Sequence, residues 1–459
     1  MAFKVVPQYA ANMYPKGFQC GAFYAGIKKA AKKSPDLAVI YSTTSCKAAA
    51  TFTLNRFQAA PVLVSKLVLS DKGDEVYGVI MNSGCANACT GDQGLKDATT
   101  MSSLASRTFI PKTRLDELKM LVMSTGVIGQ ALPMDKVSQG IEALQKHIGN
   151  THQHWSDVAR AFMTTDTFPK LRVRELKLPQ CGETVRLAGI SKGAGMIHPN
   201  MATMLGTVVT DAKFASTEVL QEMTKSVVDR TFNAITIDGD TSTNDTFCVL
   251  ANGAAMRLPL SGQDVAAFQE CLLDLSKELA QLIVRGASIS NIFWSMNVFV
   301  DGEGATKFVT VHVTNAKSTE DARKVAKAIC TSSLVKTAIY GQGQPSLILN
   351  VLIVISIDAN WGRIIAAAGY SEAEFDPAAL NLFICAGTAQ PGRLNKPSLQ
   401  LVRNGQPHQL NEEVASTIFR GDDITVEVNL NADGSGAEAT MWTCDFSKEY
   451  VAINADYRS

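Results

Sequence analysis

Apolar and branched residues recur along the chain in two alternating patterns. Short runs rich in valine, isoleucine and leucine, bounded by polar turns, predict strands, and longer segments with apolar residues three and four positions apart predict helices. The predicted strands are 37–41, 61–64, 76–81, 119–126, a hairpin over 171–190, 205–209, 307–313, 398–402, 424–430 and 437–444. The predicted helices are 92–109, 134–147, one from 216, 265–282 and 319–329. This alternation is compatible with an α/β fold but does not single one out.

Length and charge narrow the class of protein. A chain of 459 residues can bury a large core and suggests two domains or two closely packed halves. Lysine plus arginine and aspartate plus glutamate both number 43, so the formal net charge is zero. Proteins that bind nucleic acid or an anionic membrane surface need a basic excess, and we therefore expect neither partner. The most apolar run, 346–357, is too short to span a bilayer.

The cysteines and the first residues bear on location. The ten cysteines are scattered without zinc-type pairs, which favours free thiols in a reducing compartment. No acidic residue precedes Asp36, whereas six lysines do. A basic, acid-free start is a weak mitochondrial signal, and a lysine-rich solvated surface is the alternative.

The central stretch 192–205 has a glycine-rich first half and then enters the strand predicted at 205–209. Just before that strand stand Ala202 and the hydroxyl of Thr203. A flexible loop that delivers one hydroxyl to the start of a strand is a reasonable way to present a nucleophile. A surface loop that enters a core strand is the plainer interpretation, and short motifs do not exclude it.

Three further loops carry candidate chemistry. The segment 82–91 suits a tight loop in which backbone amides come close to a ligand, or an ordinary turn. Thr125 offers a hydroxyl and Gly126 an N–H without a side chain beside it, which together could form an oxyanion hole or a strand-end turn. The polar loop 164–170 contains hydroxyls that could hold an amino acid.

Two patterns suggest metal sites, and we expect none. The loop 238–245 contains three carboxylates, but no later glutamate or suitably spaced glycine completes a calcium loop. A hydrogen-bonded turn that supports the site is the favoured interpretation. His147, His152 and His154 follow a predicted helix, and no nearby carboxylate or cysteine completes a ligand set, so we interpret them as solvated histidines.

Eight sequence blocks, in order, resemble those of the ornithine acetyltransferase family of arginine biosynthesis, whose members are also called bifunctional glutamate N-acetyltransferases. The blocks cover nearly the whole chain and lie at 82–91, 124–129, 164–170, 192–205, 238–245, 302–307, 360–363 and 453–459. One such block is a weak signal, whereas eight in the family's order are specific. The chain is thus similar to this family, and to its fungal members in particular.

The resemblance implies a role for individual residues. Thr203 corresponds to the family's nucleophile, and the chain would cleave itself between Ala202 and Thr203, leaving an alpha chain of 1–202 and a beta chain of 203–459. Thr125 and Gly126 correspond to the oxyanion hole. The substrate-binding positions implied by the resemblance are Thr165 (or its neighbour Thr164), Lys192, Thr203, Glu303, Asn454 and Ser459.

The resemblance also implies the reaction. Thr203 would take acetyl from N-acetylornithine and pass it to glutamate in a ping-pong exchange. Threonine needs a base, and after cleavage its own α-amine, with a reference pKa of about 7.7 to 8.0, can accept the hydroxyl proton. Before cleavage, His198 is the one candidate base in the sequence neighbourhood. Lys192 could bind a substrate carboxylate and Glu303 an ammonium group.

Further expectations follow from the same resemblance. The fold would be α/β with stacked β-sheets sandwiched between helices, and the C-terminal part of the beta chain would form a smaller domain. Acetyl-CoA is a second acetyl donor in some members, and no residue here decides its use; no other cofactor is expected. The cleaved chains would associate as a heterodimer and assemble into a heterotetramer, in the mitochondrial matrix or, alternatively, in the cytoplasm.

Two segments depart from the family pattern. Residues 286–300 and 343–357 interrupt matched blocks, are equal in length, and are largely apolar and uncharged. We hypothesise that they are translated introns, and a transcript that retains both would refute this. If they belong to the protein, the position of Glu303 is in doubt.

Two other functions remain open at the level of sequence. A self-processing aminopeptidase of related fold would use serine as its nucleophile, which disfavours that function for a chain with Thr203. A non-catalytic relative that binds amino acids would not need Thr203, Thr125 and Lys192 together.

Overall fold

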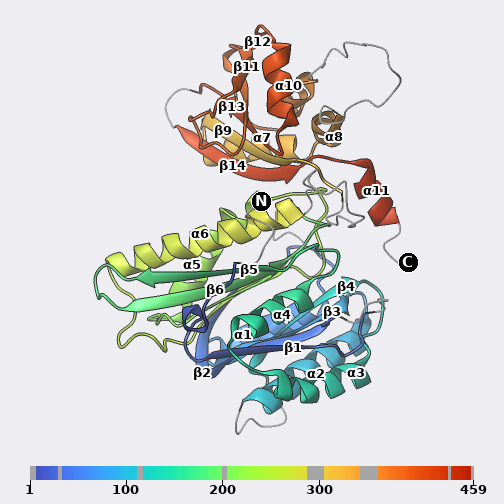
Figure 1. The fold of residues 1–459 in the computed structure, drawn as a ribbon, viewed down its shortest axis with the longest axis vertical. Coiled ribbons are helices and arrows are strands. Elements are labelled where there is room, and N and C mark those ends of the chain that lie inside the picture. The colour runs from blue at the N-terminus through green and yellow to red at the C-terminus, as the bar shows by residue number, and fades with distance from the viewer. Residues whose placement is uncertain are drawn as a thin grey trace. The chain divides into compact units, whose positions relative to one another are not determined.

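The computed structural model describes residues 7–28, 34–110, 117–198, 204–286, 304–341, 360–432 and 436–455. The chain divides into two compact units, shown in Figure 1. The larger unit comprises Met1–Asn233 and Asp240–Ile283, and the smaller comprises Ala234–Gly239 and Val284–Ser459. Among the described residues, no helix is long and apolar enough to cross a membrane.

The larger unit is built on an 8-stranded sheet. Its strands follow the order β4-β3-β2-β8-β7-β6-β5, and β1 pairs with β2 beside this path. The strands are β1 (Phe18–Phe23), β2 (Leu37–Phe52), β3 (Val76–Cys85), β4 (Met120–Val127), β5 (Lys170–Lys177), β6 (Thr184–Lys192), β7 (Leu205–Thr210) and β8 (Thr246–Ala251). The predicted hairpin over 171–190 is confirmed as the antiparallel pair β5 and β6.

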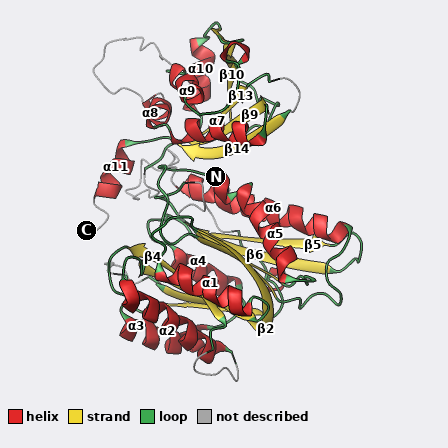
Figure 2. Ribbon diagram, turned by 180° about the vertical axis from the view of Figure 1, so that it is seen from behind, coloured by secondary structure: helices red, strands yellow, loops and turns green. Residues whose placement is uncertain are grey.

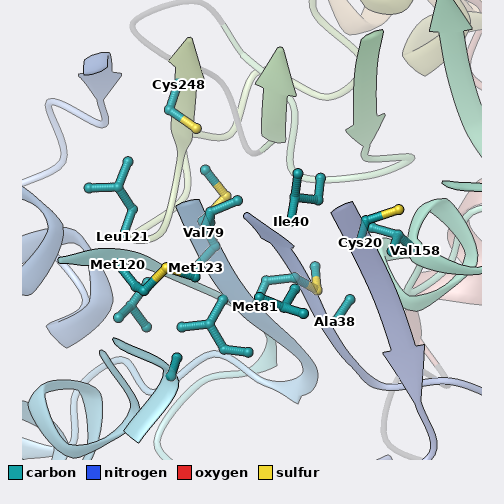
Figure 3. Packing of buried hydrophobic residues seen from close by; sticks show 14 of the residues in the cluster. Cys20, Ala38, Ile40, Val79, Met81, Met120, Leu121, Met123, Val158 and Cys248 are labelled. Carbon is teal, nitrogen blue, oxygen red and sulfur yellow. The ribbon is translucent and has the colours of Figure 1, made fainter. Parts of the chain in front are cut away.

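The long strand β2 belongs to both halves of this sheet. Its first part pairs with β1 and β3, and its second part, from Lys47 to Phe52, pairs with β8. The two halves face each other, because the Thr207 hydroxyl on β7 donates to Sδ of Met123 on β4 at 3.8 Å. Buried residues from both halves form one hydrophobic cluster, part of which Figure 3 shows. Burial of this apolar surface is the main contribution to the stability of the unit.

Helices cover the outer sides of the two halves. Figures 1 and 2 show α2 and α3 outside the first half and α5 and α6 outside the second. The helices of this unit are α1 (Ala60–Lys72), α2 (Gly91–Phe109), α3 (Met134–Leu144), α4 (His152–Phe162), α5 (Thr217–Asp229) and α6 (Gln263–Gly286), with short 3-10 turns at Ala11–Met13, Gln145–His147 and Phe232–Ala234. The predicted α/β fold with stacked sheets between helices is therefore confirmed, with one continuous sheet forming both layers.

One local prediction was wrong. Residues 61–64 are not a strand but the first turn of α1, with Pro61 at the start of the helix, where its missing N–H costs nothing. The apolar run was ambiguous because α1 carries apolar residues around its circumference, with Leu63 and Leu67 exposed. His152 and His154 lie half-buried at the start of α4, and Nδ1 of His152 is hydrogen-bonded to the Tyr14 hydroxyl at 2.7 Å.

The smaller unit contains a 6-stranded sheet in the order β12-β11-β10-β13-β9-β14. Its strands are β9 (Phe308–Ala316), β10 (Asn381–Ala386), β11 (Ser398–Arg403), β12 (Gln406–Pro407), β13 (Asp423–Asn429) and β14 (Ala437–Cys444). Its helices are α7 (Thr319–Thr331), α8 (Ser333–Gly341), α9 (Gly362–Gly369), α10 (Glu412–Arg420) and α11 (Lys448–Ala455), with a 3-10 turn at Pro377–Ala379. Serine and asparagine side chains fix helix starts here, since Ser318 caps α7 and Asn411 caps α10.

The predicted chain boundary between 202 and 203 falls between β6 and β7, inside the larger unit. Both sides of that boundary thus belong to the same sheet, and β6 pairs with β7. The two suspected inserts, 286–300 and 343–357, lie outside the described residues except for Gly286, which ends α6.

Candidate active site

The predicted oxyanion donors stand at the end of β4, next to the parallel strand β3. Thr125 pairs with Ser83 and Gly126 with Gly84. Gly126 has φ +132°, and a Cβ at this position would lie 2.3 Å from the carbonyl carbon of Gly84. Only glycine fits such a backbone. The close approach therefore requires Gly126 and leaves its amide without a side chain beside it.

Lys192 ends β6, and the fold brings it to Thr125. Its Nζ donates to Oγ1 of Thr125 at 3.2 Å, and both residues are buried. A lysine ammonium can only donate, so Thr125 accepts this bond and keeps its own hydroxyl proton to donate elsewhere. A threonine oriented in this way is a hydrogen-bond donor suited to a developing oxyanion.

The predicted substrate loop 164–170 is organised by Asp166, which the sequence analysis did not single out. The Gly193 N–H donates to Oδ1 of Asp166 at 2.7 Å, and the Thr164 N–H donates to Oδ2 at 3.1 Å. Lys170 forms an ion pair with the same carboxylate, and both of these side chains are fully buried. Asp166 thus holds the candidate Thr165, its sequence neighbour, beside the loop that begins at Lys192.

Electrostatics agree with this arrangement. Burial raises the pKa of Asp166, but the charges of Lys170 and Lys192 and the Gly193 N–H outweigh it and hold the pKa down to about 2. The carboxylate is therefore ionised throughout the physiological range.

Lys28 is a third lysine near this carboxylate. Burial lowers the pKa of Lys28 to about 8, with Asp36 and Asp166 opposing the shift and Lys192 adding to it. Its Nζ donates to the Pro35 carbonyl at 3.3 Å. A Cβ on Gly84 would lie 2.9 to 3.0 Å from Lys28 atoms, so the backbone segments that carry Gly84 and Lys28 are in contact. In the sequence, Lys28 is one of six lysines that precede Asp36, and nothing there distinguishes it from the others.

A turn at 242–245 joins the ends of the two half-sheets. The Asn244 side chain donates to the carbonyls of Ala86, at 2.6 Å, and Ser124, at 3.0 Å. The Met204 N–H donates to Oδ1 of Asp245 at 3.1 Å. Residues 242–245 therefore form a hydrogen-bonded turn, as predicted, and Asp245 is a further residue that the sequence did not single out.

Other predicted site residues are placed differently. Ala202, Thr203, Glu303 and Ser459 lie outside the described residues. Asn454 is exposed on α11 in the smaller unit, and its side chain donates to the Tyr450 carbonyl at 2.9 Å. Within the described part of the chain, no group of three or more metal-type side chains could hold an ion.

Comparison with known proteins decides the family. A model of the ArgJ family matches residues 19–459. The chain belongs to the ArgJ family. It is 44% identical to the mitochondrial arginine biosynthesis bifunctional protein ArgJ of Aspergillus terreus, over 99% of this chain and 94% of that protein. The protein of the same name from Neurospora crassa is 46% identical, over 99% of this chain and 91% of that one.

Solved ArgJ structures are also similar to this chain. The ArgJ protein of Bacillus halodurans is 34% identical, covers 54% of this chain and 96% of its own, and superposes with a TM-score of 0.42. Ornithine acetyltransferase of Mycobacterium tuberculosis, complexed with ornithine, is 30% identical to this chain. The match covers 41% of this chain and 93% of that protein, with a TM-score of 0.34. The full-length fungal ArgJ relatives confirm the predicted family, its fungal type and the mitochondrial location.

Proposed function

We propose that this ArgJ protein is a glutamate N-acetyltransferase of arginine biosynthesis, which moves acetyl from N-acetylornithine to glutamate through an acetyl ester on Thr203. The observation that carries the proposal is the hydrogen bond from Lys192 to Thr125, beside the constrained Gly126. It brings three separately predicted residues together at the start of the strand that follows Thr203. Arginine biosynthesis and ornithine acetyl transfer are also what the names of its relatives describe.

The chemistry of the larger unit suits an acyl transfer. The Thr203 hydroxyl would attack the acetyl carbonyl, and the developing oxyanion would receive hydrogen bonds from the Thr125 hydroxyl and the Gly126 N–H. After self-cleavage between Ala202 and Thr203, the α-amine of Thr203 would hold the hydroxyl proton and return it in each half-reaction.

The surrounding charges favour amino-acid substrates that carry a carboxylate. Lys28, Lys170 and Lys192 interact with Asp166, and Asp36 adds a second carboxylate near Lys28. The Asp36 carboxylate accepts hydrogen bonds from the backbone N–H groups of residues 25, 27 and 28, at 2.7 to 3.0 Å. The local excess of positive charge supports Lys192 as the group that binds the substrate carboxylate. Thr165, Glu303, Asn454 and Ser459 complete the proposed binding set.

Mass spectrometry of the purified protein tests the proposal. We expect two chains divided between Ala202 and Thr203, and an acetyl adduct on the chain that begins at Thr203 after N-acetylornithine is added. Thr203→Ala should yield one uncut, inactive chain. Two chains from this variant, or hydrolysis of peptides in place of acetyl transfer, would overturn the proposal.

The finer features are part of the same proposal. Acetyl-CoA is proposed as an optional second donor, tested by whether it leaves the same adduct on Thr203. The cleaved chains are proposed to form a heterodimer and then a heterotetramer, which light scattering of the wild-type protein measures directly.

A further inference from the structure

Lys28 is held against the end of β3, next to the candidate oxyanion donors. Its backbone N–H donates to Oδ2 of Asp36 at 3.0 Å, and the Asp36 carbonyl accepts from the Ser83 N–H at 2.9 Å. A Cβ on Gly84 would lie 2.9 Å from Cγ of Lys28. The Lys28 side chain therefore starts against the part of β3 that pairs with the oxyanion donors on β4.

The Lys28 ammonium can make more hydrogen bonds than its described neighbours accept. Within the described part of the chain, its acceptor is the Pro35 carbonyl at 3.3 Å, whereas an ammonium group carries three donors. The nearby Asp36 carboxylate already accepts backbone N–H groups from residues 25, 27 and 28. A half-buried ammonium in these surroundings is suited to bind a further anion.

Lys192 approaches the same place from β6. Its Nζ donates to the Thr125 hydroxyl, which is neutral, so this bond leaves the charge of the ammonium in place. Asp245 also interacts with Lys192, but burial raises the pKa of this acid and favours its neutral form. The charge of Lys192 is one of the causes that lower the pKa of Lys28. The two ammonium groups thus repel each other, and an anion bound by both would relieve the repulsion.

The charge balance around these two lysines is positive. Lys170 is neutralised by its buried ion pair with Asp166. Asp36 then offsets one of the two remaining lysines, Lys28 and Lys192. Three lysines and two carboxylates leave a net charge of +1, which one carboxylate of a substrate would balance.

We propose that Lys28 is a second binding residue for the substrate α-carboxylate, which it holds together with Lys192. This inference rests on the proposed acetyl transfer, because the two proposed substrates, N-acetylornithine and glutamate, share this carboxylate. A single carbon joins the α-carboxylate to the nitrogen that carries or receives the acetyl group. A lysine beside the oxyanion donors therefore meets this carboxylate rather than one at the end of a side chain.

Calorimetric binding of ornithine and of putrescine tests the inference. Putrescine is ornithine without its carboxylate, and it keeps both amino groups. At neutral pH, Lys28→Met should weaken the binding of ornithine by about fivefold and should not weaken that of putrescine. The matched control is Lys47→Met, which removes a lysine paired with the exposed Asp74 and should leave the binding of both ligands unchanged.

Steady-state kinetics of Lys28→Met provide the second measurement. KM should rise by the same factor for N-acetylornithine and for glutamate, with little change in kcat, because both substrates carry the α-carboxylate and the residue does not take part in the chemical step. A rise of KM confined to glutamate would place Lys28 at the side-chain carboxylate and would overturn the assignment.

The calorimetric outcomes separate binding from a structural role. Equal weakening of ornithine and putrescine binding would overturn the inference, because a loosened site loses affinity for both ligands. Ornithine binding at the wild-type affinity would overturn it as well. A wild-type protein that binds ornithine but transfers no acetyl group would instead refute the proposed function, whatever Lys28 does.

Discussion

The loop around Asp166 and the turn around Asp245 each bury one carboxylate in the larger unit, with opposite consequences. Asp166 receives two backbone N–H groups and the ammonium of Lys170, and its pKa falls to about 2. Asp245 accepts the Met204 N–H on Oδ1, and burial raises its pKa well above the ordinary value against this bond, the charge of Lys192 and hydrogen bonds from Ser242 and Thr53.

Burial by itself pushes both pKa values upward. At Asp166 the charges of Lys170 and Lys192, together with its hydrogen bonds, outweigh burial, whereas at Asp245 the hydrogen bonds and the charge of Lys192 do not. Asp166 keeps its charge and acts as a fixed clamp, whereas burial favours the protonated form of Asp245. Asp166 is therefore the carboxylate suited to holding the substrate loop.

The largest expected effect comes from neutralising the clamp. Asp166→Asn would leave the fully buried Lys170 without its counter-charge, which should lower the free energy of unfolding by about 3 to 5 kcal/mol. Chemical denaturation of the protein measures this. The control is Asp274→Asn, which removes an exposed partner of Arg174 and should cost no more than about 1 kcal/mol. Equal losses in the two variants would remove the distinction between a buried clamp and a surface pair.

The next effect concerns Thr125, which is bonded to the lysine whose charge acts on both carboxylates. Thr125→Val keeps the shape and removes the hydroxyl, so kcat for acetyl transfer should fall by about 100- to 1000-fold with a smaller change in KM. Thr125→Ser, which retains a hydroxyl, should recover most of the rate. Steady-state kinetics decide this, and a change confined to KM would assign Thr125 to substrate binding instead.

The dependence of stability on pH should separate the two acids directly. The pKa of Asp166 is lowered on folding, so its contribution is full above the unfolded value of about 3.9 and is lost as pH falls toward about 2. The pKa of Asp245 is raised on folding, so its contribution is full below the unfolded value and is lost as pH rises.

Melting temperatures of the uncut Thr203→Ala chain, with and without Asp245→Asn, test the second half of this statement. As pH rises, the melting temperature of the chain that carries both substitutions should increase relative to that of Thr203→Ala alone. A difference that stays constant from acid to neutral pH would mean that Asp245 titrates normally.

The smallest expected effect belongs to Lys28, whose pKa is about 8 because it is buried. Its charge is present below that pH and fades above it, so KM for glutamate should rise as pH passes 8. Below pH 8, Lys28→Met should weaken glutamate binding by about 1 kcal/mol, which raises KM roughly fivefold. The variant should also lose the dependence of KM on pH. Lys47→Met, which removes a lysine paired with an exposed aspartate, is the control and should leave KM unchanged.

The fold was predictable where the local pattern and the final environment agree. The hairpin at 171–190 and the helices capped by Ser216 and Ser318 were within reach of the sequence, because alternation and capping act over a few residues. The prediction of a strand at 61–64 was wrong because an apolar run too short to show a period fits a strand and a buried helix equally well.

The site was predictable only through resemblance to a family, and in part. Lys192 and Thr125 are 67 positions apart, and no local pattern says that one donates to the other. Asp166 and Asp245 each stood inside a recognised block without being singled out, since nothing in the sequence distinguishes a buried carboxylate that meets two lysine charges from one that meets a single lysine charge.

The sequence by itself determined many of the strands and helices, the family and the chemical types available to the site. Tertiary structure decided which lysine meets which carboxylate, because pKa and hydrogen bonding depend on burial and on donors brought from distant strands. The bend of the sheet at β2 places β4 over β7, and only that closure sets Thr125, Lys192 and the turn at Asp245 within one unit.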